Sequence, residues 1–197
     1  MSARIAVLVS GGGTNLQALL DAEASGILHS GHIELVISNN PAAYALIRAK
    51  NAGVETAVIS KKELGSQQAF EAALVKKLEQ SAIDVIILAG FMNILSGDFT
   101  ARYPRRILNV HPSLIPSFCG EGFYGLRVHE AALNYGVKVT GATVHYVNEV
   151  ADGGEIIAQK AVDILPGDTP ETLQRRVMEQ AEWVLLPRAA EQVCARF

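Results

Sequence analysis

The stretch that decides the fold reads Arg4-Ile5-Ala6-Val7-Leu8-Val9-Ser10-Gly11-Gly12-Gly13-Thr14-Asn15-Leu16. Residues 4–10 form a continuous apolar strand, which is typical of a sheet buried on both faces. Leu16, Leu19 and Leu20 then recur at helical spacing. A glycine-rich turn between a strand and a helix presents backbone N–H groups and the positive end of a helix dipole, so it favours an anion. The turn does not match the G-x-G-x-x-G or Gly-Lys-Ser/Thr fingerprints, so it is a weak signal by itself.

Strand-like apolar runs alternate with helical patterns along most of the chain. We expect strands at residues 32–38, 55–59, 85–88 and 107–110, and helices at residues 41–52, 67–80 and 127–135. Such alternation predicts a mostly parallel, twisted sheet flanked by helices. Residues 139–147 and 155–162 are two β runs joined by a short loop, which predicts an antiparallel C-terminal strand pair. A last helix should begin at Asp168-Thr169-Pro170-Glu171 and kink or stop near Pro187.

The composition excludes several classes of protein. The chain has 197 residues, 49% of them hydrophobic, which suits one globular domain spanning residues 1–197. The net charge is −3 and no basic block occurs, which counts against nucleic-acid binding. The apolar runs are shorter than the roughly 20 residues of a membrane span, and no signal peptide is recognisable. Two widely separated cysteines indicate neither a disulfide framework nor a metal cluster. We expect a cytoplasmic protein that acts on small molecules.

A polar motif directly follows the apolar run at residues 106–108 and reads Asn109-Val110-His111-Pro112-Ser113-Leu114-Ile115-Pro116. Asn109 and His111 are two residues apart, so on an extended backbone their side chains leave the same face. Ligands of open α/β sheets bind beyond the carboxyl ends of strands. The alternative is an ordinary polar loop in which a backbone carbonyl satisfies His111.

A second loop lies far downstream and ends in Asp152-Gly153-Gly154, between the β runs at residues 139–147 and 155–162. The glycines allow a sharp turn and a close approach to a ligand. Asp152 is either a site residue or a simple Asx-turn residue, which is the usual role of aspartate before glycine.

Together, these motifs resemble the folate-dependent formyltransferase family. The pattern Asn-x-His-Pro-Ser-Leu-x-Pro and the later Asp-Gly-Gly carry the resemblance. Residues 10–17 and 89–96 are similar to the phosphate loop and the folate segment of the members that formylate phosphoribosyl-glycinamide. The resemblance runs from about Arg4 to Pro187. It implies a single-domain, Rossmann-like formyltransferase fold, with substrate binding in the N-terminal half and the folate and catalytic loops in the C-terminal half.

The resemblance also implies an activity, which is transfer of the formyl group of 10-formyltetrahydrofolate to the amine of 5-phosphoribosyl-glycinamide in purine biosynthesis. Attack of the amine on the formyl carbon produces a tetrahedral oxyanion. Asn109 is expected to donate to that oxyanion, His111 to stabilise it as an imidazolium and supply a proton, and Asp152 to hold His111. The carbon electrophile needs no metal, so we expect direct transfer with no metal and no covalent enzyme intermediate.

Binding residues are carried over from the same resemblance. Gly13, Thr14 and Asn15 should hold the substrate phosphate, and Glu182 should contact the glycinamide substrate. The folate pocket should be lined by residues of two opposed segments and one helix: Gln67, Met92, Asn93, Ile94, Leu95, Asn148, Glu149, Val150 and Ala151. His145 lies in a strand-like run and is expected to be structural or to support the site rather than to react.

The chain departs from the family pattern at several positions. Asn93 and Gln67 stand where arginines are often found, which could weaken binding or shift the charged contact to Lys61 and Lys62. The segment 118–125 is longer than in many relatives. The last helix carries one extra residue before Pro187, which makes Glu182 the least certain assignment.

Three other functions compete with formyl transfer to the glycinamide. A formyltetrahydrofolate deformylase shares the Asn-His-Asp set but hydrolyses the donor, and it usually carries an extra N-terminal domain. A methionyl-tRNA formyltransferase is larger and has a basic RNA-binding domain. A non-catalytic nucleotide-binding module would explain the glycine loop but not Asn109, His111 and Asp152 together. We expect a monomer or a homodimer.

Overall fold

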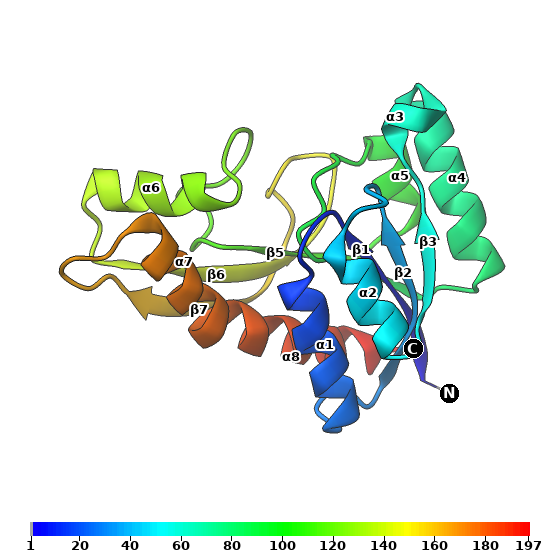
Figure 1. Cartoon of the computed structure of the whole chain (residues 1–197), viewed down its shortest axis with the longest axis horizontal. Helices are drawn as coiled ribbons and strands as arrows, with labels where there is room; N and C mark the ends of the chain where they lie inside the picture. The colour runs from blue at the N-terminus through cyan, green and yellow to red at the C-terminus, as the bar shows by residue number, and fades with distance from the viewer. Residues whose placement is uncertain (1) are drawn as a thin grey trace.

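The central feature of the fold is one sheet with the strand order β3-β2-β1-β4-β5-β6-β7, seen in a computed structural model that describes residues 2–197 (Figure 1). Its strands are β1 (Ala3–Val9), β2 (Gly31–Ser38), β3 (Glu55–Val58), β4 (Val85–Leu88), β5 (Ile107–His111), β6 (Val139–Tyr146) and β7 (Ile156–Asp163). Strands β1 to β5 pair in parallel, whereas β6 is antiparallel to both β5 and β7. The expected α/β fold with a mostly parallel sheet and an antiparallel C-terminal pair is therefore confirmed.

Helices cover both faces of this sheet. They are α1 (Thr14–Ala24), α2 (Tyr44–Asn51), α3 (Lys61–Leu64), α4 (Gln67–Gln80), α5 (Gly97–Arg102), α6 (Leu126–Tyr135), α7 (Pro170–Val177) and α8 (Trp183–Cys194). Ile5, Val7 and Val9 of β1 join one buried cluster with α1 and α8, while Ala6 and Leu8 join another with α4 and α5. Successive side chains of a strand point to opposite faces, so β1 has to be apolar from Ile5 to Val9, where both faces are buried. Among the described residues, no helix has the length and apolar character needed to cross a membrane.

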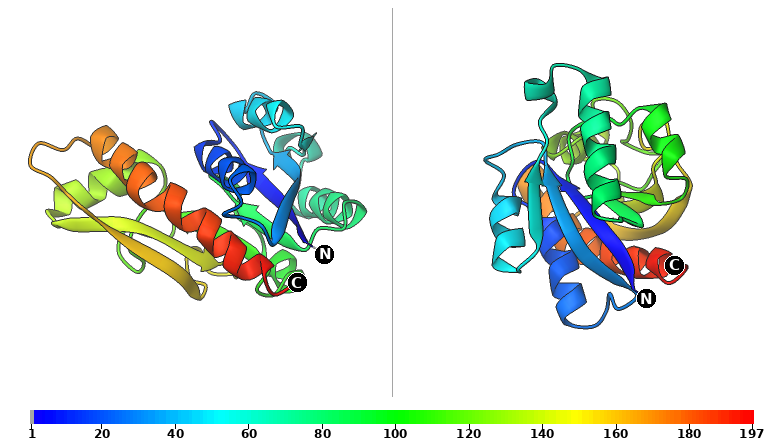
Figure 2. Two further views of the ribbon diagram at one scale, coloured as in Figure 1. Left: turned by 90° about the horizontal axis from the view of Figure 1, so that it is seen from below. Right: turned by 90° about the vertical axis from the view of Figure 1, so that its right-hand side faces the viewer.

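The C-terminal helical segment differs from the sequence-based expectation. It runs from α7 through a π-helical segment, Met178–Glu182, into α8, which continues past Pro187 to Cys194. Figure 2 shows this segment extending from the β6–β7 end of the sheet to the side where both termini lie. Of the two expectations for Pro187, a kink or a stop, the stop is wrong, and the irregular geometry lies before the proline. Pro187 cannot donate to the carbonyl of Trp183, so the missing bond falls directly after the π-helical segment.

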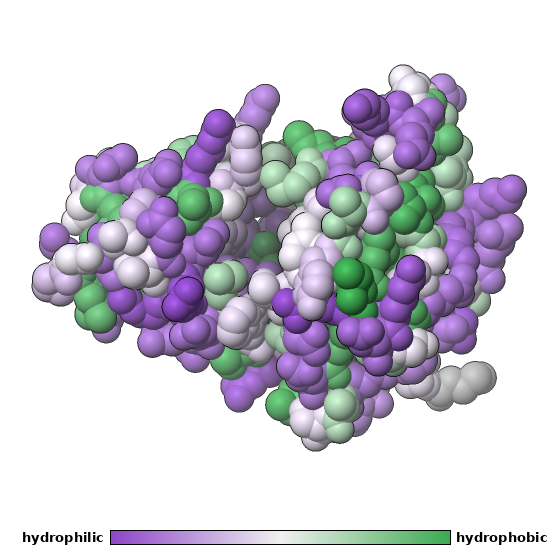
Figure 3. Space-filling view, viewed as in Figure 1, coloured by the Kyte–Doolittle hydropathy of each residue, from purple (hydrophilic) through white to green (hydrophobic). Residues whose placement is uncertain are grey.

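The parallel strands β1, β4 and β5 deliver three loops to one edge of the sheet. Residues 10–13 follow β1, residues 89–96 follow β4, and residues 112–125 follow β5. The first two loops are joined directly, because the backbone N–H of Met92 donates to Ser10 Oγ at 2.9 Å. Figure 3 shows the surface hollowed in the middle of one face, between α6 on one side and α1 and α2 on the other.

Candidate active site

Strand β5 extends to His111, so Asn109 and His111 both lie on regular strand backbone and share a face. His111 is buried and Asn109 is half-buried. Strand β6 pairs with β5 in a register that sets His145 opposite Asn109. Directly opposite residues of an antiparallel pair bring their side chains together. The antiparallel neighbour therefore adds His145 to the Asn-x-His pair.

His145 orients the amide of Asn109. The Nδ1 atom of His145 lies 2.8 Å from the carbonyl oxygen of Tyr146. A carbonyl only accepts, so this nitrogen carries a hydrogen. The other ring nitrogen, Nε2, lies 3.1 Å from Asn109 Nδ2 and 3.6 Å from Asp152 Oδ1. The amide nitrogen of Asn109 also lies 3.5 Å from Asp152 Oδ1, so the ring and the carboxylate together hold it in place. The sequence-based expectation of a supporting role for His145 agrees with this contact.

Asp152 closes the cluster from the loop that follows β6. Its φ of 54° is in the left-handed region, which turns the carboxylate back toward β5. One oxygen, Oδ2, lies 3.4 Å from His111 Nδ1 and accepts from the backbone N–H of Gly120 at 2.8 Å. Burial by itself would raise the pKa of this carboxyl, but the contacts with His145, His111 and Gly120 outweigh burial and lower the pKa of Asp152. Asp152 is therefore held as a carboxylate.

His111 faces a hydrogen-bond acceptor at each ring nitrogen. Its Nε2 atom lies 2.9 Å from the carbonyl oxygen of Phe118, while Nδ1 faces Asp152. A neutral ring carries one hydrogen and can donate to only one of these acceptors, whereas an imidazolium can donate to both. The sequence offered a backbone carbonyl and an aspartate as alternative partners of His111, and the structure provides both. The backbone of Phe118 and Gly120 was not anticipated, because main-chain contacts of a loop leave no pattern in its side chains.

The cluster lies at a cavity of about 520 Å³, which is within the range for small-molecule sites. One wall is the segment 92–95 after β4, and the other is the segment 148–151 after β6. These are eight of the nine residues expected to line a folate pocket. The ninth, Gln67, lies outside this cavity and donates instead to the carbonyl oxygen of Ile94 at 3.0 Å. Gln67 therefore supports the segment 92–95 from outside the cavity.

The glycine loop adopts the shape of an anion site. Gly13 precedes α1 with a φ of 73°, and a Cβ there would lie 2.6 Å from the Cβ of Ala45, so a glycine is required. No side chain caps the helix N-terminus, and its first turn has no acidic residue. The N–H groups at the start of α1 therefore have no side-chain acceptor, and the helix dipole favours an anion there.

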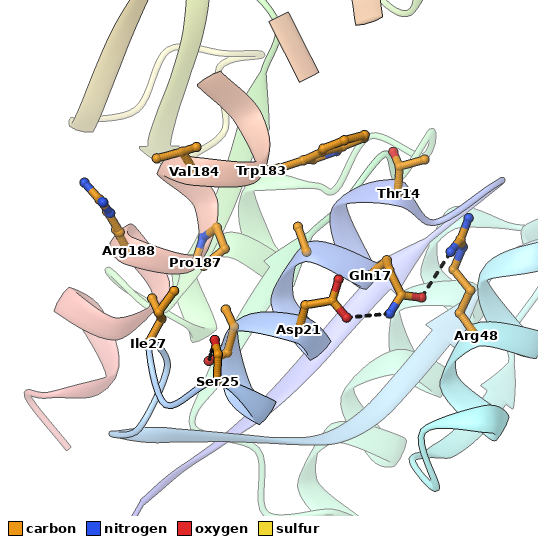
Figure 4. Close-up of a pocket in the computed structure, with 12 residues that line it drawn as sticks. Thr14, Gln17, Asp21, Ser25, Ile27, Arg48, Trp183, Val184, Pro187 and Arg188 are labelled. Carbon is orange, nitrogen blue, oxygen red and sulfur yellow. Dashed lines mark hydrogen bonds between the residues drawn. The ribbon is translucent and has the colours of Figure 1, made fainter. Parts of the chain in front are cut away.

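Arg48 braces this loop from α2, beside a groove between α1 and α8 (Figure 4). Its Nε atom donates to the carbonyl oxygen of Gly12 at 2.8 Å, and its Nη1 atom donates to Gln17 at 3.0 Å. Gln17 in turn donates to Asp21 at 2.9 Å, as the dashed lines in Figure 4 show. The carbonyl side of the loop is thus satisfied by the protein, which leaves its N–H side for a ligand.

Glu182 reaches the loop from the π-helical segment. Asn15 Nδ2 donates to Glu182 Oε2 at 2.7 Å, and the carboxyl group is 6% exposed. Burial raises the pKa of Glu182, and the hydrogen bond from Asn15 offsets only part of that effect. Glu182 is the last residue of the π-helical segment Met178–Glu182, and its carboxyl group is turned inward onto Asn15.

The described residues contain no group of three or more His, Cys, Asp or Glu side chains arranged to hold a metal ion.

The model of the formyl transferase family matches residues 3–189. The chain belongs to the formyl transferase family.

The relatives within the formyl transferase family include an enzyme of similar length and a much longer multifunctional protein. A phosphoribosylglycinamide formyltransferase of Haemophilus influenzae is 42% identical over 93% of this chain and 84% of its own length. A trifunctional purine biosynthetic protein adenosine-3 of Bos taurus is 46% identical over 98% of this chain, which spans only 18% of that longer protein. The crystal structure of glycinamide ribonucleotide transformylase 1 from Symbiobacterium toebii has a TM-score of 0.92 and 42% identity, covering 99% of this chain and 89% of that one. These likenesses confirm the formyltransferase fold expected from the motifs.

Proposed function

We propose that this formyl transferase moves the formyl group of 10-formyltetrahydrofolate to the amine of 5-phosphoribosyl-glycinamide, a reaction of purine biosynthesis. The observation that carries the proposal is the meeting of Asn109, His111 and Asp152 at a folate-sized cavity. The names of the relatives support the glycinamide as acceptor. A nucleotide-binding module has no need of this polar cluster.

The arrangement supports binding of two substrates side by side. The N-terminus of α1, with Gly13, Thr14 and Asn15, suits the substrate phosphate. Glu182 lies against Asn15 and suits a polar group of the same substrate. Because Ser10 and Met92 are hydrogen-bonded, the phosphate loop adjoins the wall formed by residues 92–95. The cavity between that wall and residues 148–151 fits the ring system of the formyl donor.

The residues of the cluster have distinct roles in the proposed reaction. The acceptor amine forms a bond to the formyl carbon, and the carbonyl electron pair moves to the oxygen. Asn109 turns the amide hydrogen of its long contact with Asp152 to this oxyanion, whose charge the His111 imidazolium offsets. The oxyanion then collapses, the bond from carbon to the folate nitrogen breaks, and that nitrogen receives a proton in place of the one that the acceptor amine loses. Asp152 keeps His111 charged and oriented.

The loop of residues 112–125 takes part in this mechanism. His111 Nε2 is already bonded to the carbonyl oxygen of Phe118. Direct contact between Nε2 and the oxyanion therefore requires an exchange of partners, in which the carbonyl of Phe118 gives way. Asn109 has to release only its long contact of 3.5 Å with Asp152 Oδ1, so we assign the first contact with the oxyanion to Asn109.

The decisive experiment is to incubate the protein with 10-formyltetrahydrofolate in the presence and absence of the glycinamide substrate. We expect consumption of the donor only when the amine is present. Consumption without the amine would support a deformylase, and no consumption with either would support a binding module. A cytoplasmic location, a single domain, and a monomeric or homodimeric state stay predictions of the sequence.

A further inference from the structure

Asp152 and one wall of the folate cavity belong to the same loop, residues 147–154, which leaves the end of β6 and returns to β7 (Figure 1, in yellow). We call it the Asp152 loop. A backbone hydrogen bond closes its base, from the N–H of Tyr146 to the carbonyl oxygen of Glu155 at 2.9 Å. The pairing of β6 with β7 is irregular beside this bond, because its register shifts immediately before His145. Regular strand pairing therefore holds the base of the loop only loosely.

The back of the Asp152 loop is not packed solidly against the neighbouring helix. A hollow of about 280 Å³ lies between α5 and the two ends of the loop. Residues 97, 100 and 101 line it on the side of α5, and residues 146–149, 154 and 155 line it on the side of the loop. A segment with open space behind it and few apolar contacts has low local stability. The position of the loop therefore depends on the polar contacts at its ends.

Arg105 connects these two ends across the hollow. Its guanidinium group forms a bidentate ion pair with the carboxylate of Glu155, in which Nη1 contacts Oε2 and Nη2 donates to Oε1 at 3.2 Å. The same group lies over the ring of Tyr146, with its central carbon 4.6 Å from the centre of the ring. Arginine suits this double contact, because its planar fork pairs with a carboxylate while its face stacks on an aromatic ring. Arg105 thus holds both residues that flank the Asp152 loop.

The backbone of Arg105 is strained. Its φ is 56°, in the left-handed region, where a Cβ crowds the backbone and glycine is favoured. Residues in such conformations persist where the surrounding structure holds them, and they cluster at functional sites. The contacts of the Arg105 side chain with Glu155 and Tyr146 can offset the cost of this conformation. The strain therefore indicates that the side chain contributes more than an ordinary surface arginine.

A shift at the base of the loop reaches Asp152 through a short stretch of chain. Asp152 is only three residues before Glu155. Gly154 lies against the end of β6, because a Cβ there would be 1.7 Å from the carbonyl oxygen of Tyr146. Asp152 Oδ2 in turn lies 3.4 Å from His111 Nδ1. The position of the carboxylate is therefore coupled to how firmly residues 146 and 155 are held.

We propose that Arg105 is a positioning residue of this site: by connecting the two ends of the Asp152 loop, it keeps the carboxylate of Asp152 at His111. The inference rests on the proposed function, because it assumes that Asp152 supports His111 during formyl transfer. Arg105 touches no reacting atom in this scheme. It raises the fraction of molecules in which Asp152 and the folate wall of residues 148–151 are arranged for the reaction.

The substitution Arg105→Gly tests the proposal, because glycine removes the side chain and suits the left-handed backbone. The free energy of unfolding should therefore not fall. We expect kcat to fall by about 2- to 5-fold, since the side chains of Arg105 and Glu155 are 53% and 61% exposed and the energy of a well-aligned exposed pair is modest. KM for the formyl donor should rise by a similar factor, because residues 148–151 belong to the same loop, whereas KM for the glycinamide should not change.

Two further variants show whether Arg105 acts through Glu155. In a double-mutant cycle, Arg105→Gly combined with Glu155→Gln should lower kcat no more than Arg105→Gly alone. The matched control is Ala82→Gly, which places a glycine at another left-handed position, at the end of α4, and should leave kcat and both KM values unchanged. Losses that add in the double variant overturn the proposal. A fall in kcat of Arg105→Gly that accompanies a fall in the free energy of unfolding also overturns it.

A titration without substrates separates this proposal from the proposed function. Burial raises the pKa of Asp152, but the contacts of its carboxylate with His145, His111 and Gly120 outweigh burial and lower the pKa. A loop that is held less firmly makes these contacts for less of the time, so the pKa of Asp152 should rise in Arg105→Gly. Carbon NMR of the Asp152 carboxyl group measures this titration. A rise supports the proposal even if no formyl group is transferred, and an unmoved titration overturns it even if kcat falls.

Discussion

His129 should make the stability of this protein fall as the solution becomes acidic. The side chain lies on α6 and is 0% exposed, and neither of its ring nitrogens has a hydrogen-bond partner among the described residues. Burial, with a smaller contribution from the charge of His111, lowers the pKa of His129 from 6.5 to about 4. The folded state therefore holds this ring neutral at pH values where the unfolded chain protonates it.

The size of the effect follows from this difference in pKa. Above pH 6.5 the ring is neutral in both the folded and the unfolded state, so its titration does not change the free energy of unfolding. Between pH 6.5 and about 4 the unfolded state binds the proton and the folded state does not, so stability falls by about 1.4 kcal/mol per pH unit. The loss should reach about 2 kcal/mol at pH 5 and level off at about 3 kcal/mol below pH 4, where the folded state is protonated too.

The substitution His129→Leu tests this reasoning, because leucine has a similar size and does not titrate. At pH 8 the variant should match the wild type or exceed it by about 1 kcal/mol, since two unpartnered polar atoms are removed. At pH 5 its advantage should be larger by about 2 kcal/mol. Urea unfolding at both pH values gives these free energies. Val128→Ala, at a buried non-titrating neighbour on the same helix, should lower stability equally at both. If wild type and His129→Leu show parallel pH profiles, the reasoning is refuted.

Three further predictions concern the site itself. Asn109→Ala should lower kcat by about 10²–10³-fold, as is usual for one lost oxyanion donor, with little change in KM; a near-normal kcat with a sharply raised KM would instead assign Asn109 to substrate positioning. Asp152→Asn should move the high-pH limb of kcat/KM to lower pH, because the carboxylate that favours the charged form of His111 is removed. The NMR titration of His111 should shift in the same direction. An unchanged titration would show that Asp152 does not act on His111. Gly13→Ala should weaken binding of the phosphorylated substrate in calorimetric titration, because its Cβ would lie 2.6 Å from Ala45 Cβ, whereas Gly12→Ala meets no atom within 4 Å and should be mild. Equal losses of affinity for Gly13→Ala and Gly12→Ala would show that this loop does not bind the substrate phosphate. Equal affinities of the wild type for the phosphorylated and the dephosphorylated substrate would show the same.

Helices with a regular apolar spacing could be predicted from the sequence, whereas short or irregular helical segments could not. The helix expected at residues 67–80 has those bounds in the structure, because Phe70, Leu74 and Leu78 recur at the period of an α-helix and a serine caps its start. The short helix α3 was not expected, since four exposed residues carry no periodic pattern. The last helix was expected to kink or stop near Pro187, and it continues to Cys194 after a π-helical segment.

The sequence by itself determined the strands, most of the helices, and the side-by-side placement of Asn109 and His111, because each depends on spacing along a few residues. Only the tertiary structure decided which partners these side chains meet. The antiparallel pairing of β5 and β6 brings His145 against Asn109, and the loop after β5 brings the carbonyl of Phe118 to His111. Such contacts join residues that are distant in the chain, and no local period or propensity encodes them.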